Sequence, residues 1–238
     1  MNIALIGYGK MGKTIERIAH QRGHTVVCII DVDNLQMFDS EEFKSADIVI
    51  EFTSPSVAEH NIRKCFARGK SVVCGTTGWT ERLSALKKEI DEQNYTLFWS
   101  SNFSLGMNVF FALNTYLAKI MNKFPSYDIA MEEVHHTHKA DTPSGTAITL
   151  AESILHEIDR KTVWVDGAAR NPNEVSIESI RTGDVPGIHT VIYESNVDEI
   201  TLTHSAKSRD GFALGAIIAA EFTLGKKGFL GMNDMMKF

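Results

Sequence analysis

Three histidines and a lysine lie within five positions of one short stretch, which consists of His135, His136, Thr137, His138 and Lys139. An imidazole exchanges a proton near neutral pH, and a neighbouring ammonium group binds anions or donates a proton. Just after Pro143, the small residues of Ser144–Thr146 open a run with apolar side chains at helical spacing. A helix that begins in this way presents unpaired backbone N–H groups, which bind carboxylates or phosphates. The stretch therefore offers an acid, a cation and an anion-binding helix start.

Two other interpretations of this stretch remain open. Glu133, His135, His136 and His138 offer ligands for a metal ion. We expect no metal there, because adjacent residues on a strand point to opposite faces and the spacing matches no recognised zinc motif. Alternatively, the histidines are partly exposed structural residues, which leaves Lys139 and the helix start unexplained. The catalytic interpretation is favoured, since reduction of a polarised C=C or C=N bond needs a proton donor beside a hydride donor.

A glycine-rich loop near the N-terminus predicts the site of that hydride donor. It consists of Gly7, Tyr8, Gly9, Lys10, Met11 and Gly12. The loop joins the apolar strand Ile3–Ile6 to a segment of helical periodicity at Lys13–Arg22, and a second strand, Thr25–Ile30, ends on Asp31. In such a fingerprint the first glycine permits a tight turn, the second lets the backbone approach a pyrophosphate, and the third allows close helix–strand packing. The sequence therefore predicts a dinucleotide site.

Asp31 bears on which dinucleotide binds. Its carboxylate is placed to accept hydrogen bonds from the adenosine ribose, and it repels the 2′-phosphate of NADP. This favours NAD, although Lys10 and Lys13 lie close enough in sequence to leave NADP open.

Further strands extend the first domain at Ala46–Phe52, Ser71–Cys74 and Thr96–Trp99, with helices predicted from Pro55 to Ala67 and at Glu81–Gln93. Polar segments follow the last two strands at their carboxyl ends, where open α/β sheets bind ligands. Of these, Gly75, Thr76 and Thr77 are expected to contact the nicotinamide half of the nucleotide. The polar segment Val32–Ser45 is short for a crossover helix, so we expect a loop or one irregular turn. Five strands alternating with helices predict a Rossmann-type, doubly wound parallel sheet.

The pattern changes after Gly106. A long apolar helix is predicted at Met107–Lys123, and the strand Tyr127–Val134 leads into the His-rich stretch. Segments rich in β-branched residues follow at 162–165, 175–181, 189–194 and 199–204, separated by turn signals. They predict an α+β domain with an antiparallel or mixed sheet, whose uncovered face is a candidate surface for self-association. The helix Phe212–Phe222 is expected to pack back on the first domain. We therefore assign residues 1–103, completed by 209–238, to a dinucleotide-binding domain and 104–208 to a substrate-binding and oligomerisation domain.

Composition excludes several classes of function. The chain has 238 residues and a formal net charge of −6, which argues against general nucleic-acid binding. Its three cysteines are widely spaced without a CxxC pair, so buried thiols are expected and a disulfide framework is not. No signal-type segment or long apolar run is present, and we expect a soluble cytoplasmic protein without membrane contact.

The stretch from Glu133 to Ala147 resembles the signature E-x-H-H-x-x-K-x-D-x-P-S-G-T-A of the 4-hydroxy-tetrahydrodipicolinate reductase (dihydrodipicolinate reductase) family. The similarity spans nearly the whole chain, including the glycine loop, Gly75–Thr77, Ser101–Ser104 and Arg181–Gly183. The resemblance implies reduction of 4-hydroxy-tetrahydrodipicolinate in lysine biosynthesis through diaminopimelate, with NADH or NADPH, by a homotetramer that assembles through the second domain's sheet.

The resemblance also implies roles for individual residues. His135 would be the catalytic acid and Lys139 the second proton donor. His136 would contact substrate, and Ser144, Gly145 and Thr146 would hold a carboxylate. The nucleotide site would comprise Gly7, Tyr8, Gly9, Lys10, Met11, Gly12, Asp31, Gly75, Thr76, Thr77, Ser100, Ser101, Asn102 and Phe103.

Small departures from the family pattern bear on the cofactor. An arginine that often follows the acidic residue in NADPH-using members is replaced by Val32, and the segment after it is short. Two alternatives stay open at this point. One is another two-domain NAD-dependent dehydrogenase, which would lack the paired histidine, lysine and carboxylate cradle. The other is a non-enzymatic nucleotide-sensing regulator, which would ordinarily carry a basic surface.

Overall fold

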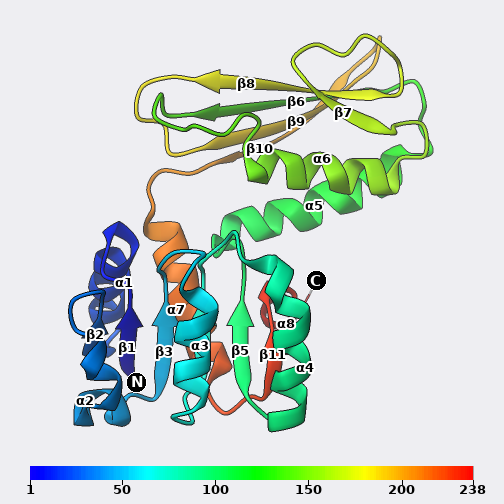
Figure 1. Ribbon diagram of the computed structural model, residues 1–238. Coiled ribbons are helices and arrows are strands. Elements are labelled where there is room, and N and C mark those ends of the chain that lie inside the picture. Colours follow the sequence, from blue (N-terminus) through cyan, green and yellow to red (C-terminus); the bar gives the residue numbers. More distant parts are fainter. Residues whose placement is uncertain (238) are drawn as a thin grey trace. The chain divides into compact units, whose positions relative to one another are not determined.

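The computed structural model describes residues 1–237 (Figure 1). The chain divides into two compact units. The first comprises Met1–Leu105 together with the described residues from Arg209 onward, and the second comprises Gly106–Ser208. The polypeptide thus leaves the first unit once and returns to complete it. Within the described residues, no helix combines the length and apolar character that a membrane crossing requires.

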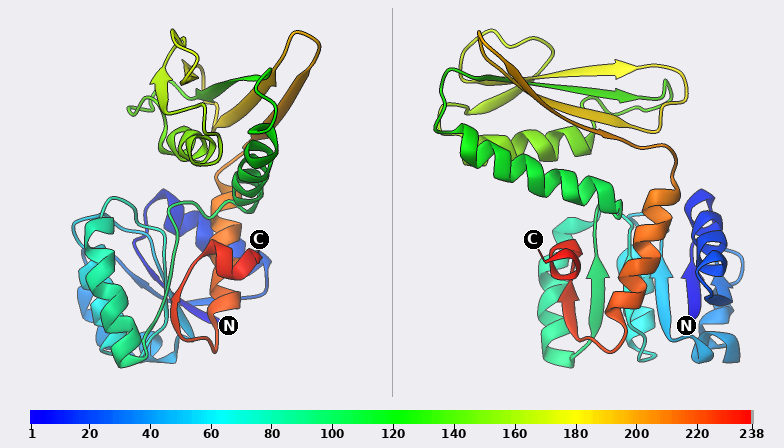
Figure 2. Two further views of the ribbon diagram at one scale, coloured as in Figure 1. Left: turned by 90° about the vertical axis from the view of Figure 1, so that its right-hand side faces the viewer. Right: turned by 180° about the vertical axis from the view of Figure 1, so that it is seen from behind.

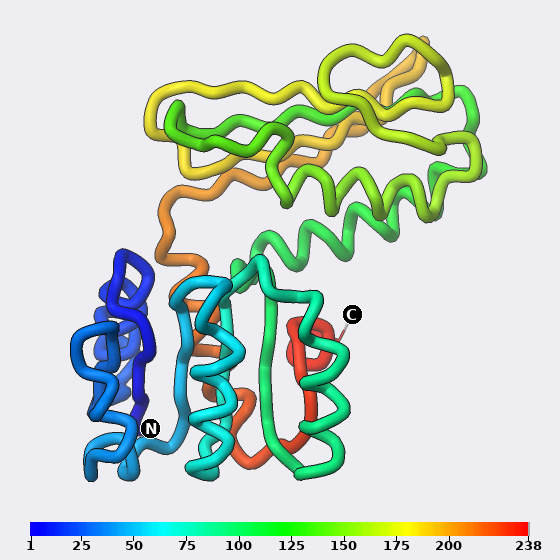
Figure 3. Tube along the Cα trace, viewed as in Figure 1, coloured from blue at the N-terminus to red at the C-terminus, as the bar shows by residue number. Residues whose placement is uncertain are grey.

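The first unit is built on a six-stranded sheet with the order β11-β5-β4-β3-β1-β2, in which every pairing is parallel. Its strands are β1 (Asn2–Ile6), β2 (Thr25–Ile30), β3 (Ile48–Glu51), β4 (Val72–Cys74), β5 (Thr96–Trp99) and β11 (Gly228–Leu230). This confirms the predicted Rossmann-type sheet, with one strand more than the five expected. The extra strand comes from the C-terminal segment, which runs beside β5 (Figure 3). Its three residues are too few to show an alternating pattern in the sequence.

Helices cover both faces of this sheet (Figure 2). They are α1 (Lys10–Gln21), α3 (Ala58–Phe66), α4 (Leu83–Gln93), α7 (Asp210–Thr223) and α8 (Met232–Met236), with a short 3₁₀ turn η2 at Thr80–Arg82. One buried cluster contains Ile62 of α3 and Leu86 of α4, and the other contains Ile15 of α1 and Ile217 of α7. The nearly unbroken apolar strands between these layers are what a parallel sheet with both faces covered requires.

The segment Val32–Ser45 differs from its prediction. Instead of a loop or one irregular turn, it forms a 3₁₀ helix, η1 (Leu35–Asp39), and a short α-helix, α2 (Glu41–Ser45). Ser40 caps α2 by accepting a hydrogen bond from the Phe43 amide at 3.1 Å. Phe38 and Phe43 are fully buried with ring centroids 5.4 Å apart. Burial of two aromatic rings therefore organises a segment that looks polar in the sequence.

The second unit pairs two helices with a mixed sheet of order β10-β9-β6-β8-β7. Its elements are α5 (Leu105–Met121), β6 (Asp128–His135), α6 (Gly145–Glu157), β7 (Val163–Asp166), β8 (Glu174–Arg181), β9 (Ile188–Glu194) and β10 (Glu199–Ser205). Strand β8 is parallel to β6 and β7, whereas β9 is antiparallel to β6 and β10. Both helices lie on one face of the sheet (Figure 1). The predicted mixed sheet is confirmed.

The burial pattern of β6 explains how the His-rich stretch is positioned. Residues alternate along the strand, and Ile129 and Met131 point into the core beneath α5 and α6. Glu133 and His135 continue the same alternation and are buried as well. The strand that builds the core therefore delivers two polar side chains to its inner face.

Helix α7 provides a test of how the C-terminal segment is held to the first unit. A Cβ added at Gly215 would lie 1.7 Å from the carbonyl oxygen of Phe103, whereas one at Gly211, in the same helix, would meet nothing nearer than 4.0 Å. We expect Gly215→Ala to lower the free energy of unfolding by about 2 kcal/mol or more, because backbone must shift. Gly211→Ala should change it by no more than about 0.5 kcal/mol. Urea unfolding of the full chain measures both, and equal stability of the two variants would contradict the close packing.

Candidate active site

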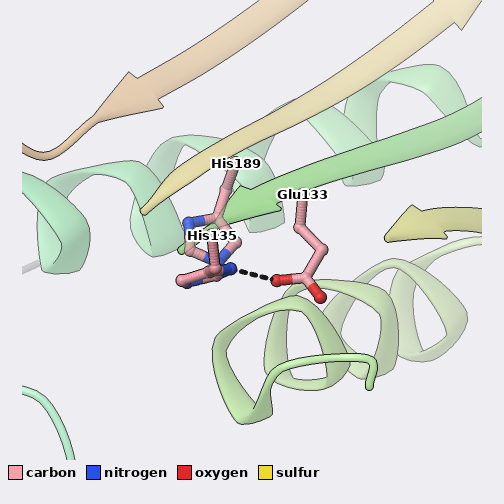
Figure 4. A group of neighbouring side chains, drawn as sticks. All are labelled: Glu133, His135 and His189. Atoms are coloured by element: carbon pink, nitrogen blue, oxygen red, sulfur yellow. Dashed lines mark ion pairs between the residues drawn. The ribbon is translucent and has the colours of Figure 1, made fainter. Parts of the chain in front are cut away.

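A buried carboxylate and an imidazole meet at the end of β6. Glu133 is fully buried and His135 is 8% exposed. One carboxylate oxygen of Glu133, Oε2, lies 2.5 Å from Nδ1 of His135 (Figure 4). This contact fixes the ring orientation, so Nε2 is the nitrogen left to exchange a proton with a ligand.

The second carboxylate oxygen of Glu133 joins two further elements. Its Oε1 accepts hydrogen bonds from Nη2 of Arg181 at 2.7 Å and from the backbone amide of Ser144 at 3.0 Å. Burial alone would raise the pKa of Glu133, but the hydrogen bonds from His135, Arg181 and Ser144 hold it well below its usual value. Glu133 thus stays ionised and connects β6, β8 and the start of α6.

Gly187 leaves space for the free nitrogen of His135. A Cβ added there would lie 3.0 Å from His135 Nε2. The loop before β9 that carries Gly187 is tied to the His-rich stretch by two backbone hydrogen bonds. The His136 amide donates to the Val185 carbonyl at 2.8 Å, and the Thr137 amide donates to the Gly183 carbonyl at 3.1 Å. The backbone directly after His135 is therefore fixed.

His189 of β9 completes the buried group. Its ring lies beside that of His135 (Figure 4), with the two ring centroids 5.0 Å apart. Its Nε2 lies 3.2 Å from the hydroxyl of Ser144. Burial, and next the proximity of His135, lower the pKa of His189 to about 4. His189 is therefore a neutral imidazole at pH 7, and it packs against His135 without adding a second charge.

The helix that was predicted after Pro143 begins at Gly145. Ser144 caps α6 by accepting a hydrogen bond from the Ala147 amide at 3.2 Å. Gly145 is exposed, and no atom lies within 4 Å of the position that a Cβ would occupy. The amides of Gly145 and Thr146 therefore stand at an open helix N-terminus.

Lys139 is linked to this helix start through Asp141. Its Nζ pairs with both oxygens of Asp141, at 2.7 and 2.9 Å. The hydrogen bond from Lys139 holds the pKa of Asp141 below its usual value, and the Gly145 amide contributes in the same direction. A carboxylate within the chain thus already experiences the cation and the helix amide that were predicted to bind a substrate carboxylate.

The remaining predicted residues of the stretch lie close by. His136 is half-buried, and its ring centroid is 6.3 Å from that of the exposed His138. Among the described residues, one group of potential metal ligands lies together, Glu133, His135 and His189. It differs from the sequence-based set of Glu133, His135, His136 and His138, because alternation along β6 separates neighbouring side chains.

The first unit holds a cavity of about 470 Å³ at the carboxyl ends of β1, β2 and β3. Gly7, Tyr8, Gly9 and Asp31 line it, as the fingerprint predicts. Gly7 has φ +91°, and a Cβ there would lie 2.2 Å from the Phe52 carbonyl oxygen, so the tight turn requires glycine. Asp31 is exposed at the cavity wall and accepts hydrogen bonds from the amides of Tyr8 and Val32.

A second cavity of about 200 Å³ lies over β3 and β4. Met11, Gly75, Thr76 and Thr77 line it together with Pro55, and it shares Phe52 and Thr53 with the larger cavity. Six predicted nucleotide residues line neither cavity: Lys10, Gly12, Ser100, Ser101, Asn102 and Phe103. Gly12 instead packs against the Gly7 carbonyl, and Phe103 is buried against Phe52. A nucleotide contact for these six stays a prediction.

The prediction from the sequence missed the roles of several site residues. Glu133 was considered only as a metal ligand, although a charged residue on the buried side of β6 is itself a signal. Arg181 and His189 come from separate strands, and no local pattern links them to His135. The cavity residues not predicted include Val32, Leu35, Phe52, Thr53, Val57, His60, Asn61 and Lys64. Phe52 and Thr53 were placed in or after a strand, but their cavity position follows from the sheet order.

Comparison with known proteins identifies relatives along the full chain. Residues 1–103 match the family model described as dihydrodipicolinate reductase, N-terminus, and residues 106–236 match the model for its C-terminus. The second match includes α7, which the structure places in the first unit.

Individual relatives agree with the family models. A 4-hydroxy-tetrahydrodipicolinate reductase of Christiangramia forsetii is 44% identical over 236 residues, covering 99% of this chain and 98% of the relative. One from Archaeoglobus fulgidus is 33% identical and covers both chains completely. Among solved structures, dipicolinate-bound dihydrodipicolinate reductase from Paenisporosarcina sp. TG-14 has a TM-score of 0.76 at 21% identity, with 98% of each chain covered, which shows a shared fold.

The lowered pKa of His189 predicts a pH-dependent stability. Between pH 6.5 and about 4 the unfolded chain binds a proton at this residue and the folded chain does not, so stability falls as the pH falls through that window. The loss amounts to about 3 kcal/mol at most. Urea unfolding at pH 7 and pH 4.5 should show a smaller loss in His189→Gln than in the wild type.

His156, whose side chain is 83% exposed in the same unit, supplies the control. His156→Gln should keep the wild-type pH dependence. Identical slopes in all three proteins would show that His189 is protonated as readily in the folded as in the unfolded chain.

Proposed function

The chain belongs to the dihydrodipicolinate reductase family, and on that premise we propose that it reduces 4-hydroxy-tetrahydrodipicolinate to tetrahydrodipicolinate with NADH or NADPH. The reaction consumes one proton and releases water. It belongs to lysine biosynthesis through diaminopimelate. The chain is thus an NAD(P)H-dependent oxidoreductase of amino-acid biosynthesis.

One observation carries this proposal in structural terms. Glu133 connects a proton-exchanging imidazole, His135, to the amide-bearing start of α6 through its two carboxylate oxygens. A cyclic substrate with carboxylates needs both functions at a fixed separation, because proton transfer requires a positioned reaction centre. The family assignment identifies the substrate. The contacts of Glu133 support the proposal that His135 transfers the proton while the start of α6 binds a carboxylate.

His135 is proposed to donate the proton to the substrate through Nε2. The Glu133 carboxylate at Nδ1 fixes the orientation of the ring. His189 remains neutral beside it and therefore does not repel the proton that His135 carries. Lys139 is proposed as the second proton donor, and His136 as a substrate contact.

Carboxylate binding is proposed for the helix start and its neighbouring cation. The amides of Gly145 and Thr146 and the ammonium of Lys139 neutralise a substrate carboxylate, with Ser144 holding the helix end in place. Asp141 supports this assignment, since its carboxylate already pairs with Lys139. A substrate carboxylate replaces Asp141 at these donors with little electrostatic rearrangement.

The cavities of the first unit fit a dinucleotide. The turn at Gly7, the exposed backbone at Gly9 and the acid at Asp31 are the features that hold a pyrophosphate and an adenosine ribose. When bound, the reduced nicotinamide supplies the hydride for the reaction. Asp31 favours NADH by repelling a 2′-phosphate, while the ammonium group of Lys64 on the cavity wall can pair with that phosphate and so permits NADPH binding.

Assembly and location complete the proposal. We propose a homotetramer formed through the sheet of the second unit, whose helices cover one face. We propose the cytoplasm as its location, in keeping with three buried cysteines that are all free.

The proposed activity is tested directly with enzymatically generated 4-hydroxy-tetrahydrodipicolinate. Oxidation of NADH and NADPH is followed by the loss of the reduced-nicotinamide absorbance. We expect turnover with both nucleotides and a higher kcat/KM with NADH, because of Asp31. Absence of turnover with either nucleotide, in protein that binds NADH, would reject the substrate assignment.

His135→Gln tests the proton donor. We expect kcat to fall by roughly 10²–10⁴-fold, the usual contribution of a general acid, with unchanged NADH affinity. His138→Gln is the matched control, because His138 is exposed in the same stretch. Steady-state kinetics and fluorescence titration of NADH measure the two effects, and undiminished turnover of His135→Gln would exclude it as the acid.

A further inference from the structure

Glu51 is a second fully buried carboxylate, and it lies in the first unit at the carboxyl end of β3. None of the ion pairs formed by the described residues includes it. A buried charge without a cation is unfavourable unless hydrogen bonds satisfy it. Such a residue therefore calls for a functional explanation.

Three neutral donors converge on this carboxylate. The hydroxyl of Thr53 donates to Oε1, while the Thr76 hydroxyl and the Cys74 thiol donate to Oε2 at 2.8 and 3.1 Å. Burial, and next the charge of Glu51, raise the pKa of Cys74 well above its usual value, so the thiol keeps its proton. The carboxylate is thus fully hydrogen-bonded, yet its negative charge is not neutralised by any cationic partner among these three.

Two of the three donors line the smaller cavity. Thr53 and Thr76 belong to its wall, and the Thr76 hydroxyl also accepts a hydrogen bond from the Thr53 amide at 2.8 Å. The charge of Glu51 is therefore one side chain away from the cavity. Because Thr76 is buried and hydrogen bonds hold both hydroxyls against the carboxylate, water screens its field at the cavity less than it would screen an exposed charge.

The order of the strands indicates which part of a dinucleotide this cavity receives. The adenosine half belongs to the β1–β2 side, where Asp31 lies, and the rest of the molecule extends across the switch point towards β3 and β4. The two cavities share Phe52 and Thr53 and so lie next to each other. The cavity over Thr76 is therefore the nicotinamide side.

We propose that Glu51 is an electrostatic positioning residue that favours the oxidised nicotinamide ring, which is positively charged, over the reduced ring, which is neutral. The inference rests on the proposed nucleotide-dependent function. The same field stabilises the positive charge that develops on the ring during the reaction, without contact between Glu51 and the ring. Thr53 and Thr76 carry the effect by holding the carboxylate in place.

The test compares the affinities of the two redox forms. NADH binding is measured by fluorescence titration and NAD⁺ binding by calorimetry, for the wild type, Glu51→Gln and Glu51→Asp. Because Glu51→Gln removes the charge, it should weaken the binding of NAD⁺ relative to that of NADH by about three- to thirtyfold. This is the range expected for the interaction of two charges at an effective dielectric constant of about 20 and above. Glu51→Asp keeps the charge and should keep most of the wild-type ratio.

Cys74→Ala is the matched control, since it removes one hydrogen bond to Glu51 and leaves the charge. It should not change the ratio of the two affinities. If Glu51→Gln does not fold, Glu51→Met supplies a second neutral side chain of similar volume. Thermal unfolding establishes which variants are folded before titration.

The results separate this inference from the proposed function. If the neutral variants bind NAD⁺ and NADH with equally weakened affinity, or with unchanged affinity, the electrostatic role is overturned. Glu51 would then only support the loops after β3 and β4 that carry Thr53 and Thr76. Failure of the wild type to bind either nucleotide would instead reject the nucleotide-dependent function itself.

Discussion

The carboxylate of Glu133 is the contact on which the geometry of the second unit's site depends. It accepts hydrogen bonds from the amide of Ser144, the cap of α6, and from the guanidinium of Arg181 on β8, and it lies against the imidazole of His135. Removing it would leave the buried His135 and the half-buried Arg181 without their common partner, which would lower the free energy of unfolding. The carboxylate therefore fixes the relative positions of three elements that are distant in the sequence.

Arg181 extends this network to the segment before α6. Its Nη2 also donates to the Asp141 carbonyl and to the Thr142 hydroxyl, at 2.7 and 3.2 Å. The loop that carries Lys139 and Asp141 is thereby attached to β8 at the position where the helix begins. His135 and the proposed carboxylate site at the start of α6 are therefore held by the same network of Glu133 and Arg181. A displacement of one of them also shifts the other.

Local patterns predicted the elements and part of the site, but not the contacts between strands. The strand before the His-rich stretch and the small residues at the start of α6 are local signals, and both entered the prediction. Arg181 binds Glu133 across 48 positions of sequence, and only the pairing of β6 with β8 brings them together. The helical turns around Phe38 and Phe43 were missed for a similar reason, because burial against distant residues decides their conformation. Strand β11 is too short to show a pattern at all.

The two buried carboxylates illustrate different solutions to one physical problem. The negative charge of Glu133 is paired with Arg181 and lies against His135, so its main effect is to hold these two side chains in position. Glu51 is compensated by two hydroxyls and a thiol, which satisfy its hydrogen-bonding capacity and leave its net charge intact. A carboxylate of the first kind organises structure, whereas one of the second kind projects a field. Glu133 lies near the end of β6 and Glu51 at the end of β3. A buried carboxylate near the end of a strand thus orients side chains in the second unit, and in the first unit it supplies a negative charge near the proposed nicotinamide site.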